Sequence, residues 1–430
     1  MAIVLARGIS PARVAAFRIL EQVERGAFSS VLLAAEEPRL QAVDRALCHE
    51  LVLGVLRWQL LLDKIVEHFS RKRIESLDKP VRIALRLGLY QLRFLTRIPA
   101  SAAVNESVSL VRRARLSSAA AFVNALLRRA VREPEYDPAA DVSDPIEQIA
   151  VRTSHPAWMI ARWTSWLGIE EAEAFARANN LVPPTAFRVV AKRANQSEVL
   201  SKLNAAESSD IVDGGWRISG AAPVLRELSA AGEIYLQDEA SQLVAQLVDA
   251  KRGERVLDLC AAPGGKTTMI ADRSGDGALV VAADRSATRM ETVVTTTRLH
   301  QLDGIRPVIL DAAKQLPFRP QTFDKVLVDA PCSGTGTLRR NPEIRWRLTP
   351  DDIVVLAEQQ KRILSRALEM VRPGGRLVYS TCSVEREENE DVIAEVPAQF
   401  RLVNTVRTWP HREGSDGFFV AVFEAADFRR

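Results

Sequence analysis

The stretch LDLCAAPGGKTT at residues 257–268 decides the fold, and its Gly-Lys-Thr end raises the question of the ligand. A phosphate-binding loop of the form G-x-x-x-x-G-K-[ST] needs a glycine six residues before its lysine, because that glycine opens the loop around the phosphates. Here Cys260 stands six residues before Lys266, and Pro263 lacks one of the N–H groups that such a loop would use. A nucleoside triphosphatase is therefore the weaker interpretation, and a ligand of another kind is favoured.

The chain around this stretch alternates short apolar runs with helical patterns. Continuous apolar strands that alternate with helices are typical of a parallel sheet covered by helices on both faces. From about Gly232 onward we therefore predict an α/β, Rossmann-like domain with a doubly wound sheet. Its predicted strands lie within residues 255–261, 278–284, 305–311, 323–331, 375–383 and 417–424.

Acidic residues stand at the ends of several predicted strands, where doubly wound sheets bind their ligands. Asp284 comes 19 residues after Gly265, close to the spacing at which an acidic side chain accepts hydrogen bonds from a ribose diol. Asp311 and Asp329 end the next two strands. Since the chain has no G-x-G-x-x-G motif after the strand, we predict S-adenosylmethionine rather than a dinucleotide. The alternative is that these aspartates only cap helices.

Two cysteines also follow predicted strands: Cys332 in DAPCSGTG, residues 329–336, and Cys382 in STCS, residues 380–383. Two thiols at one rim of the sheet, beside a methyl donor, suggest chemistry on a pyrimidine. Carbon 5 of cytosine is a poor nucleophile, but addition of a thiolate at carbon 6 makes the ring an enamine that can attack a methyl group. Asp329 is placed to stabilise that adduct near N3. The spacing alone does not say which cysteine acts first.

Residues 1–140 have the pattern of packed amphipathic helices, and we predict an all-α domain there. Within it, residues 57–132 hold 16 Lys and Arg residues against 5 Asp and Glu residues, a net charge of +11. Such a block is either a solvated helix surface or an electrostatic footprint for nucleic acid phosphates. Residues 146–231 are predicted to form a small α+β module, and residues 232–430 the Rossmann-like domain.

Composition argues against several classes of protein. The 430-residue chain has no run of eighteen or more apolar residues, which argues against a membrane span. The four cysteines include no C-x-x-C pair and the five histidines are scattered, so we expect neither a metal site nor a disulfide framework. Cys48 and Cys260 are interpreted as buried and inert. We expect a cytoplasmic monomer.

Together, these motifs closely resemble those of the RNA 5-methylcytosine methyltransferases. The resemblance is carried by LDLCAAPGGKTT, by DAPCSGTG followed by RRNPEIRWR, by YSTCSVEREENE and by the terminal DGFF, and it runs from about residue 181 to the C-terminus. The best match is the branch that acts on bacterial 16S ribosomal RNA (RsmB, also called Sun or Fmu). The helical N-terminal region is similar to the NusB-like RNA-binding domain of that branch, mainly in length and helix pattern.

The resemblance implies an S-adenosylmethionine-dependent RNA (cytosine-5-)-methyltransferase, with ribosomal RNA as its partner and a middle module that takes part in RNA recognition. It implies that Cys382 is the nucleophile, that Cys332 assists release of the methylated base, and that Asp329 completes the catalytic set. DNA cytosine-5 methyltransferases instead use the cysteine of a Pro-Cys dipeptide, here Cys332, but the surrounding motifs favour the RNA assignment. The implied donor-binding residues are Cys260, Ala261, Ala262, Pro263, Gly264, Gly265, Lys266, Asp284, Asp311 and Asp329.

The resemblance leaves three other questions. The segment LRRNPEIRWR at residues 338–347 is interpreted as facing RNA, with an exposed basic loop as the alternative. Its basic residues Arg339, Arg340, Arg345 and Arg347 lie around Trp346. The alternative function is a non-catalytic RNA-binding or antitermination-type factor that keeps a methyltransferase fold, and the alternative substrate is transfer RNA.

Overall fold

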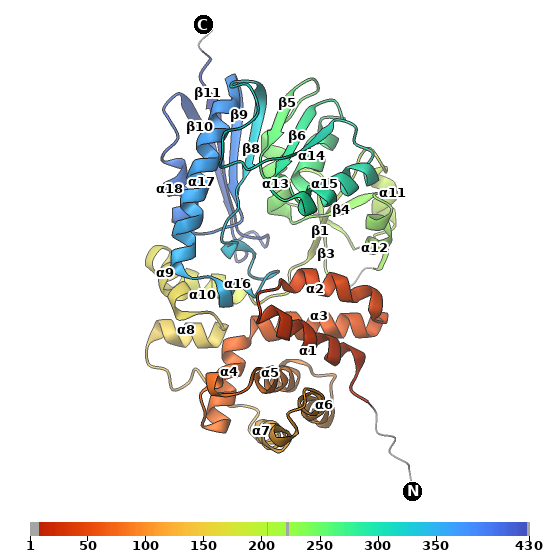
Figure 1. Ribbon diagram of the computed structural model, residues 1–430, viewed down its shortest axis with the longest axis vertical. Coiled ribbons are helices and arrows are strands. Elements are labelled where there is room, and N and C mark those ends of the chain that lie inside the picture. The colour runs from red at the N-terminus through yellow and green to blue at the C-terminus, as the bar shows by residue number, and fades with distance from the viewer. Residues whose placement is uncertain (1–7, 204, 221–222, 428–430) are drawn as a thin grey trace. The chain divides into compact units, whose positions relative to one another are not determined.

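The computed structural model describes residues 8–203, 205–220 and 223–427 of the chain. It divides into two compact units. The first unit runs up to Leu181 and also contains Leu338–Arg347, whereas the second consists of Val182–Thr337 and the chain from Leu348 onward. Figure 1 labels the helices and strands of both units.

The first unit is helical, as predicted, and α1 to α7 share one apolar core. Proline stands in the first turn of α1 and of α5, where the N–H that it lacks would have no partner within the helix. The amphipathic spacing places one apolar stripe of each helix in the common core. The helices are α1 (Pro11–Val23), α2 (Ser29–Glu36), α3 (Ala42–Arg57), α4 (Gln59–Ser70), α5 (Lys79–Phe94), α6 (Ala100–Arg113), α7 (Ala120–Arg132), α8 (Pro145–Thr153), α9 (Ala157–Leu167) and α10 (Ile169–Ala178).

The segment Leu338–Arg347, distant in sequence, is built into this helical unit and ends with the short helix α16 (Ile344–Arg347). The side chain of Arg345 is only 1% exposed. Its guanidinium donates four hydrogen bonds, all to carbonyl oxygens and all between 2.8 and 3.2 Å. The acceptors are the main-chain oxygens of Arg57, Ser154 and Asn179 and the side-chain oxygen of Asn180.

This burial corrects the interpretation for Arg345 and Arg339, which are buried and neither face RNA nor lie in an exposed loop, whereas Arg340 and Arg347 are half-buried. Arg57 ends α3, and Ser154 and Asn179 are the residues that follow α8 and α10. The last carbonyl groups of a helix lack partners within it and carry its negative dipole end. One buried guanidinium therefore caps three helix ends, a role that the local sequence did not reveal.

The second unit begins with a four-stranded antiparallel sheet in the order β2-β3-β1-β4. Its strands are β1 (Thr185–Val189), β2 (Glu207–Ser208), β3 (Gly215–Ile218) and β4 (Ile234–Leu236). The helices α11 (Gln196–Ser201) and α12 (Pro223–Ala230) contribute to one apolar cluster with this sheet. The predicted module of residues 146–231 is thus shared between the units, since α8 to α10 belong to the first and the sheet to the second.

The remaining chain forms a seven-stranded sheet in the order β10-β11-β9-β8-β5-β6-β7. Its strands are β5 (Arg255–Asp258), β6 (Leu279–Asp284), β7 (Ile305–Ile309), β8 (Phe323–Asp329), β9 (Val371–Thr381), β10 (Phe400–Thr408) and β11 (Phe418–Ala425). Strands β5 to β9 pair in parallel, which confirms the Rossmann-like class. Strand β11 is antiparallel to both of its neighbours, and β10, which we did not predict, forms the edge.

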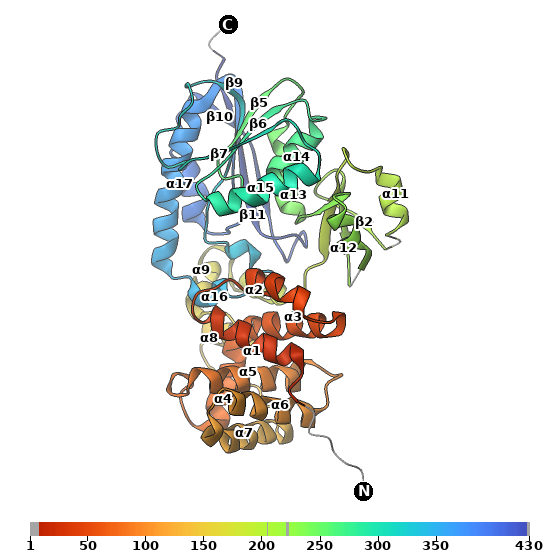
Figure 2. The same cartoon turned by 45° about the vertical axis from the view of Figure 1, so that its right-hand side comes forward.

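Helices cover both faces of this sheet, as Figure 2 shows. One face packs against α13 (Glu239–Val248), α14 (Gly265–Arg273) and α15 (Ala287–Leu299), and the other against α17 (Pro350–Met370). Adjacent strand residues such as Val326 and Leu327 belong to different cores, because side chains alternate across a strand. The carboxyl ends of the parallel strands therefore lie together at one edge.

Two negative findings concern only the residues that the structure describes. None of their helices is both long enough and apolar enough to cross a membrane. Nor do they contain a group of three or more His, Cys, Asp or Glu residues that could hold a metal ion.

Candidate active site

The turn between β5 and α14 is shaped by two glycines. Gly264 has a φ of +108°, and a Cβ atom on it would lie 3.2 Å from the Cα atom of Val293. A Cβ atom on Gly265 would lie 2.8 Å from a ring carbon of Tyr235. Because glycine has no side chain, the main chain can pass between Tyr235 on one side and Val293 on the other.

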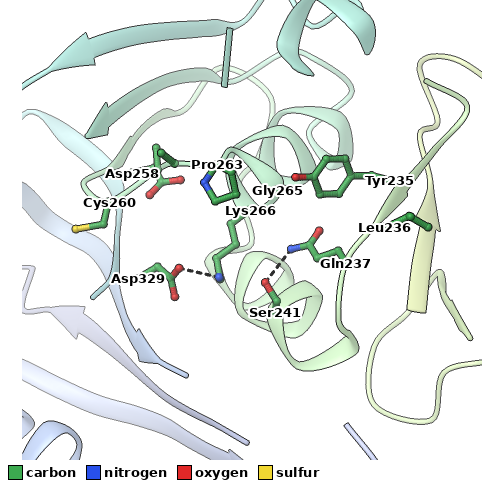
Figure 3. Close-up of a pocket in the computed structure, with 12 residues that line it drawn as sticks. Tyr235, Leu236, Gln237, Ser241, Asp258, Cys260, Pro263, Gly265, Lys266 and Asp329 are labelled. Carbon is green, nitrogen blue, oxygen red and sulfur yellow. Dashed lines mark hydrogen bonds and ion pairs between the residues drawn. The ribbon is translucent and has the colours of Figure 1, made fainter. Parts of the chain in front are cut away.

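A cavity of about 180 Å³ borders this turn, at the carboxyl ends of β4, β5 and β8 (Figure 3). Of the predicted donor-binding residues, it is lined by Cys260, Ala261, Ala262, Pro263, Gly265, Lys266 and Asp329. The other lining residues are Tyr235, Leu236, Gln237, Ser241 and Asp258, none of which we predicted. Gly264, Asp284 and Asp311 are not among the lining residues.

Asp284 and Asp311 bind main-chain N–H groups. Asp284 is 4% exposed, and its carboxylate accepts hydrogen bonds from the N–H groups of Ala262 at 3.3 Å and Ser286 at 2.9 Å. It therefore holds the turn that lines the cavity. Asp311 is half-buried and accepts a hydrogen bond from the N–H of Ala313 at 3.0 Å.

Two buried oxygen atoms in the lining have no hydrogen-bond partner: Oδ1 of Asp258 and Oε1 of Gln237. The other oxygen of Asp258 accepts a hydrogen bond from Thr267 at 2.6 Å, and the amide of Gln237 donates to Ser241 at 3.0 Å. A buried acceptor without a partner is costly unless a ligand supplies the donor. Asp258 is the last residue of β5 and lies inside the opening motif, so an earlier end of the predicted strand would have placed it at the site. Gln237 carried no such signal.

Burial raises the pKa of Asp258 to about 7, although the hydrogen bond from Thr267 opposes the increase. An unfolded aspartate has a pKa of about 3.9, so between these values the folded protein keeps a proton that the unfolded chain releases. Stability therefore falls as pH rises from about 4 to about 7, by up to about 1.4 kcal/mol per pH unit.

We expect the thermal unfolding temperature of the donor-free protein to fall relative to that of Asp258→Asn as pH rises from about 5 to about 7. The variant is the control, because asparagine occupies nearly the same volume but cannot titrate. Above about pH 7 the difference should level off. A difference that stays constant across this range would show that Asp258 does not titrate there.

Lys266 and Asp329 form an ion pair at the cavity wall, with 2.7 Å between Nζ and Oδ2. The hydroxyl of Ser380 donates a hydrogen bond to the other oxygen of Asp329 at 2.9 Å. Burial lowers the pKa of Lys266, but the charge and hydrogen bond of Asp329 outweigh it, and the net change is an increase. The site thus presents an ammonium group next to a carboxylate.

Cys332 and Cys382 meet at this edge of the sheet, with 3.3 Å between their sulfur atoms. Both are free and half-buried. The pKa of Cys332 is raised well above its usual range by its hydrogen bond to Cys382, by burial and by the charges of Cys382 and Glu388. The charge of Cys382 is one of those that raise the pKa of Lys266, after the charge and hydrogen bond of Asp329. The raised pKa favours the protonated thiol on Cys332, and the positive charge of Lys266 interacts with the charge of Cys382.

The other two cysteines have different surroundings. Cys48 is buried in the core of the first unit, where burial raises its pKa to about 12. Cys260 lines the cavity, and burial raises the pKa of its thiol as well. Both thiols are therefore held protonated and are unsuited to nucleophilic attack.

Comparison with known proteins decides the family. A family model described as 16S rRNA methyltransferase RsmB/F matches residues 245–424, the NusB family matches residues 10–132, and the ferredoxin-like domain of RsmF/B-like methyltransferases matches residues 155–223. The chain is 33% identical to the probable ribosomal RNA small subunit methyltransferase B of Bacillus subtilis, over 94% of this chain and 96% of that protein. The chain belongs to the RsmB/F family of ribosomal RNA methyltransferases.

Two further relatives agree with this assignment. The ribosomal RNA small subunit methyltransferase B of Pseudomonas putida is 36% identical, over 89% of this chain and 87% of that protein. The crystal structure of PH0851 superposes with a TM-score of 0.83 at 29% identity and covers 97% of this chain and 99% of that one. The RsmB/F chain is therefore an S-adenosylmethionine-dependent enzyme with a NusB-like helical region, which confirms the predicted fold class.

The cavity suits S-adenosylmethionine. The unpartnered oxygens of Asp258 and Gln237 are acceptors that fit the α-ammonium group of its methionine part. Asp258 and Asp329, two carboxylates in one small cavity, suit a cationic ligand and disfavour a triphosphate. The nucleoside triphosphatase interpretation therefore has no support at this site.

Proposed function

We propose that the chain methylates carbon 5 of a cytosine in 16S ribosomal RNA through a covalent adduct with Cys382. The observation that carries this proposal is the pair of sulfur atoms 3.3 Å apart, on the same edge of the sheet as the cavity. One thiol suffices to attack a base, and a second beside it can act on the adduct that the first has formed. A non-catalytic RNA-binding factor would need neither thiol there.

The proposed reaction begins at Cys382. Its thiolate forms a bond to carbon 6 of cytosine, and the electrons of the 5,6 double bond become available at carbon 5. Negative charge that spreads to N3 and O2 is stabilised by the pair of Asp329 and Lys266. S-adenosylmethionine supplies the methyl group as an electrophile for carbon 5. The proton on carbon 5 must then leave, so that the bond between carbon 6 and sulfur can break and return its electrons to Cys382.

Cys332 is the base that we propose for this last proton. Its pKa is raised first of all by its hydrogen bond to Cys382, and further by burial and by the charge of that thiolate. Once Cys382 has become a thioether, it carries no charge, and that part of the increase is removed. Cys332 is thus a protonated thiol during attack. Afterwards its lowered pKa lets that proton pass to water, and the remaining thiolate can accept the proton from carbon 5.

The first unit is proposed to bind the RNA. The exposed basic residues of its 57–132 block are Lys64, Arg71, Lys72, Arg73, Lys79, Arg97, Arg112, Arg113, Arg115, Arg128 and Arg132. Other basic residues of the same block have structural roles, since Arg86 is buried in ion pairs with Asp63 and Glu24. The exposed group supports phosphate binding that weakens as the salt concentration rises.

Bisulfite sequencing of ribosomal RNA tests the function. A strain that lacks the gene should lose one 5-methylcytosine from its 16S ribosomal RNA, and the wild-type gene should restore it. A Cys382→Ala gene should not restore it, because the variant cannot form the adduct. If the deletion strain instead loses a 5-methylcytosine from transfer RNA, the substrate is transfer RNA. If it loses no 5-methylcytosine, the proposed activity is contradicted.

Asp284→Ala is expected to weaken binding of S-adenosylmethionine by ~1–3 kcal/mol, because Asp284 holds the Ala262 turn and is proposed to accept the ribose hydroxyls. Titration calorimetry on the full chain measures this difference. Asp303→Ala is the matched control, since Asp303 is exposed in the same unit. If Asp284→Ala binds S-adenosylmethionine with unchanged affinity, Asp284 does not contribute to the donor site.

A further inference from the structure

The acidic end of YSTCSVEREENE contains a carboxylate that the proposed reaction does not use. Glu388 ends the short 3₁₀ helix Arg386–Glu388, and its side chain is fully buried. Such a carboxylate is costly to bury unless donors surround it. Burial raises the pKa of Glu388, and the hydrogen bonds that it accepts oppose that increase.

Four donors contact this carboxylate. Oε1 accepts from the N–H of Ser333 at 2.8 Å and from the side-chain amide of Gln360 at 2.9 Å. Oε2 accepts from the hydroxyl of Ser333 at 2.5 Å and from the hydroxyl of Ser383. The two hydroxyls also lie 3.1 Å from each other.

Ser333 and Ser383 are the residues that directly follow Cys332 and Cys382. The two cysteine loops are joined a second time by a hydrogen bond from the N–H of Gly336 to the carbonyl of Cys382 at 3.0 Å. Glu388 therefore reaches both loops one residue beyond each thiol. The hydroxyl of Thr335 links the loops as well, since it lies 3.2 Å from the hydroxyl of Ser383 and accepts from the N–H of Val384 at 3.1 Å. Glu388 is the link that contacts the residue next to each thiol, and the sulfur atoms lie 3.3 Å apart.

We propose that Glu388 is the positioning residue of the cysteine pair. Its carboxylate bridges Ser333 and Ser383 and holds the two thiols at the separation that the second half of the reaction needs. Glu388 touches neither cavity nor sulfur in this role, and it acts through the serines. The proposal rests on the proposed function only for its consequence in catalysis, because the separation of the thiols can be measured without RNA or donor.

Disulfide trapping measures that separation directly. Diamide takes two electrons and two protons from a thiol pair and leaves a disulfide, which forms only when the Cβ atoms can approach to about 4 Å. We expect rapid formation of the Cys332–Cys382 disulfide in the full-length wild-type protein, identified by peptide mass spectrometry. In Glu388→Ala the rate should fall about tenfold or more, because the loops lose their shared partner.

Glu388→Gln is the conservative variant and should keep the rate within about threefold of wild type. Its amide oxygen can accept the two N–H donors, and its NH₂ group can donate to the two hydroxyls. Glu387→Ala is the matched control, since it removes the neighbouring carboxylate from the same turn. It should leave the rate unchanged.

Catalysis provides the second readout. Glu388→Ala should lose about 100-fold in turnover, since a misplacement of about 1 Å costs that much, and Glu388→Gln should recover most of it. Donor affinity, measured by calorimetry, should stay at the wild-type value and report an intact fold. If Glu388→Ala does not fold, Ser383→Ala removes one hydroxyl of the network and keeps the carboxylate, and it is expected to lower the trapping rate in the same direction.

A folded Glu388→Ala protein that forms the disulfide at the wild-type rate would overturn the proposal. Rapid trapping in wild type and slow trapping in Glu388→Ala, without any methylation of RNA by wild type, would uphold the positioning role and refute the proposed function. If Glu388→Ala and Glu388→Gln lower the trapping rate equally, the negative charge matters rather than the hydrogen-bonded bridge. That result would also overturn the proposal.

Discussion

Cys332→Ala is expected to accumulate a covalent complex with RNA. Cys382 can still attack carbon 6 and carbon 5 can still be methylated, but the base for the carbon-5 proton is missing. The sulfur of Cys382 lies 3.3 Å from that of Cys332, so the missing thiol belongs beside the stalled adduct. On a denaturing gel the complex should appear as a slowly migrating band that RNase removes.

Cys382→Ala is expected to show no band and to lower methylation on the order of 10⁴-fold or more, because the nucleophile is gone. The double variant should also show no band. Cys48→Ala is the matched control, since Cys48 is buried in the core of the first unit. It should methylate RNA at the wild-type rate without accumulating a complex.

The opposite pattern would reverse the roles of the two cysteines. A complex in Cys382→Ala and none in Cys332→Ala would assign the attack to Cys332, the arrangement of the Pro-Cys enzymes that act on DNA. Methylation retained in both single variants without any complex would refute the covalent mechanism. The surroundings argue against Cys332 as the nucleophile, because its hydrogen bond to Cys382, its burial and the charges of Cys382 and Glu388 raise its pKa.

Arg345→Ala is expected to destabilise the first unit by roughly 4 kcal/mol. Each buried acceptor that loses its donor costs ~1–3 kcal/mol, and the loss of a costly buried charge offsets part of the sum. The variant would leave four carbonyl oxygens without their donor, three of them on the main chain at the ends of α3, α8 and α10. Arg345→Lys should recover part of the loss, since lysine keeps the charge but not the planar fork.

Urea unfolding followed by tryptophan fluorescence measures this difference. Trp58, Trp158, Trp163, Trp166 and Trp346 lie in the first unit, so the signal reports mainly on it. Arg128→Ala is the matched control, because Arg128 is exposed on α7 and should change stability by about 0.5 kcal/mol or less. If Arg345→Ala unfolds at the same urea concentration as Arg128→Ala, the buried guanidinium does not stabilise the unit.

The sequence by itself determined the elements and their order. The apolar runs predicted β5 to β9 and β11 because a strand buried on both faces needs continuous apolar residues. Helix patterns predicted the N-terminal helices because each must turn one apolar stripe toward a core. These features depend on neighbours only a few residues apart. The same local patterns predicted that polar residues and cysteines stand at the carboxyl ends of the strands. They did not predict which of these residues are in contact.

Only the tertiary structure decided which of these residues meet and in what environment. Cys332 and Cys382 are 50 residues apart in the chain, and their contact depends on the order β9-β8 in the sheet and on the buried carboxylate of Glu388. Asp258 and Gln237 acquire their unpartnered oxygens only because distant elements enclose them. Strand β11 runs antiparallel between β9 and β10 because the chain returns directly from the edge strand β10, a pairing that apolar runs do not specify.

Arg345 illustrates the limit of local inference most clearly. A run of arginines predicts exposure because a charge is costly to bury, and the groups that compensate for the burial of Arg345 are not its neighbours in the sequence. The compensating oxygens come from Arg57, Ser154 and Asn179, which are between 166 and 288 residues away. Composition and spacing therefore identify which groups carry charge and reactivity, whereas long-range packing determines whether water or the protein itself satisfies them.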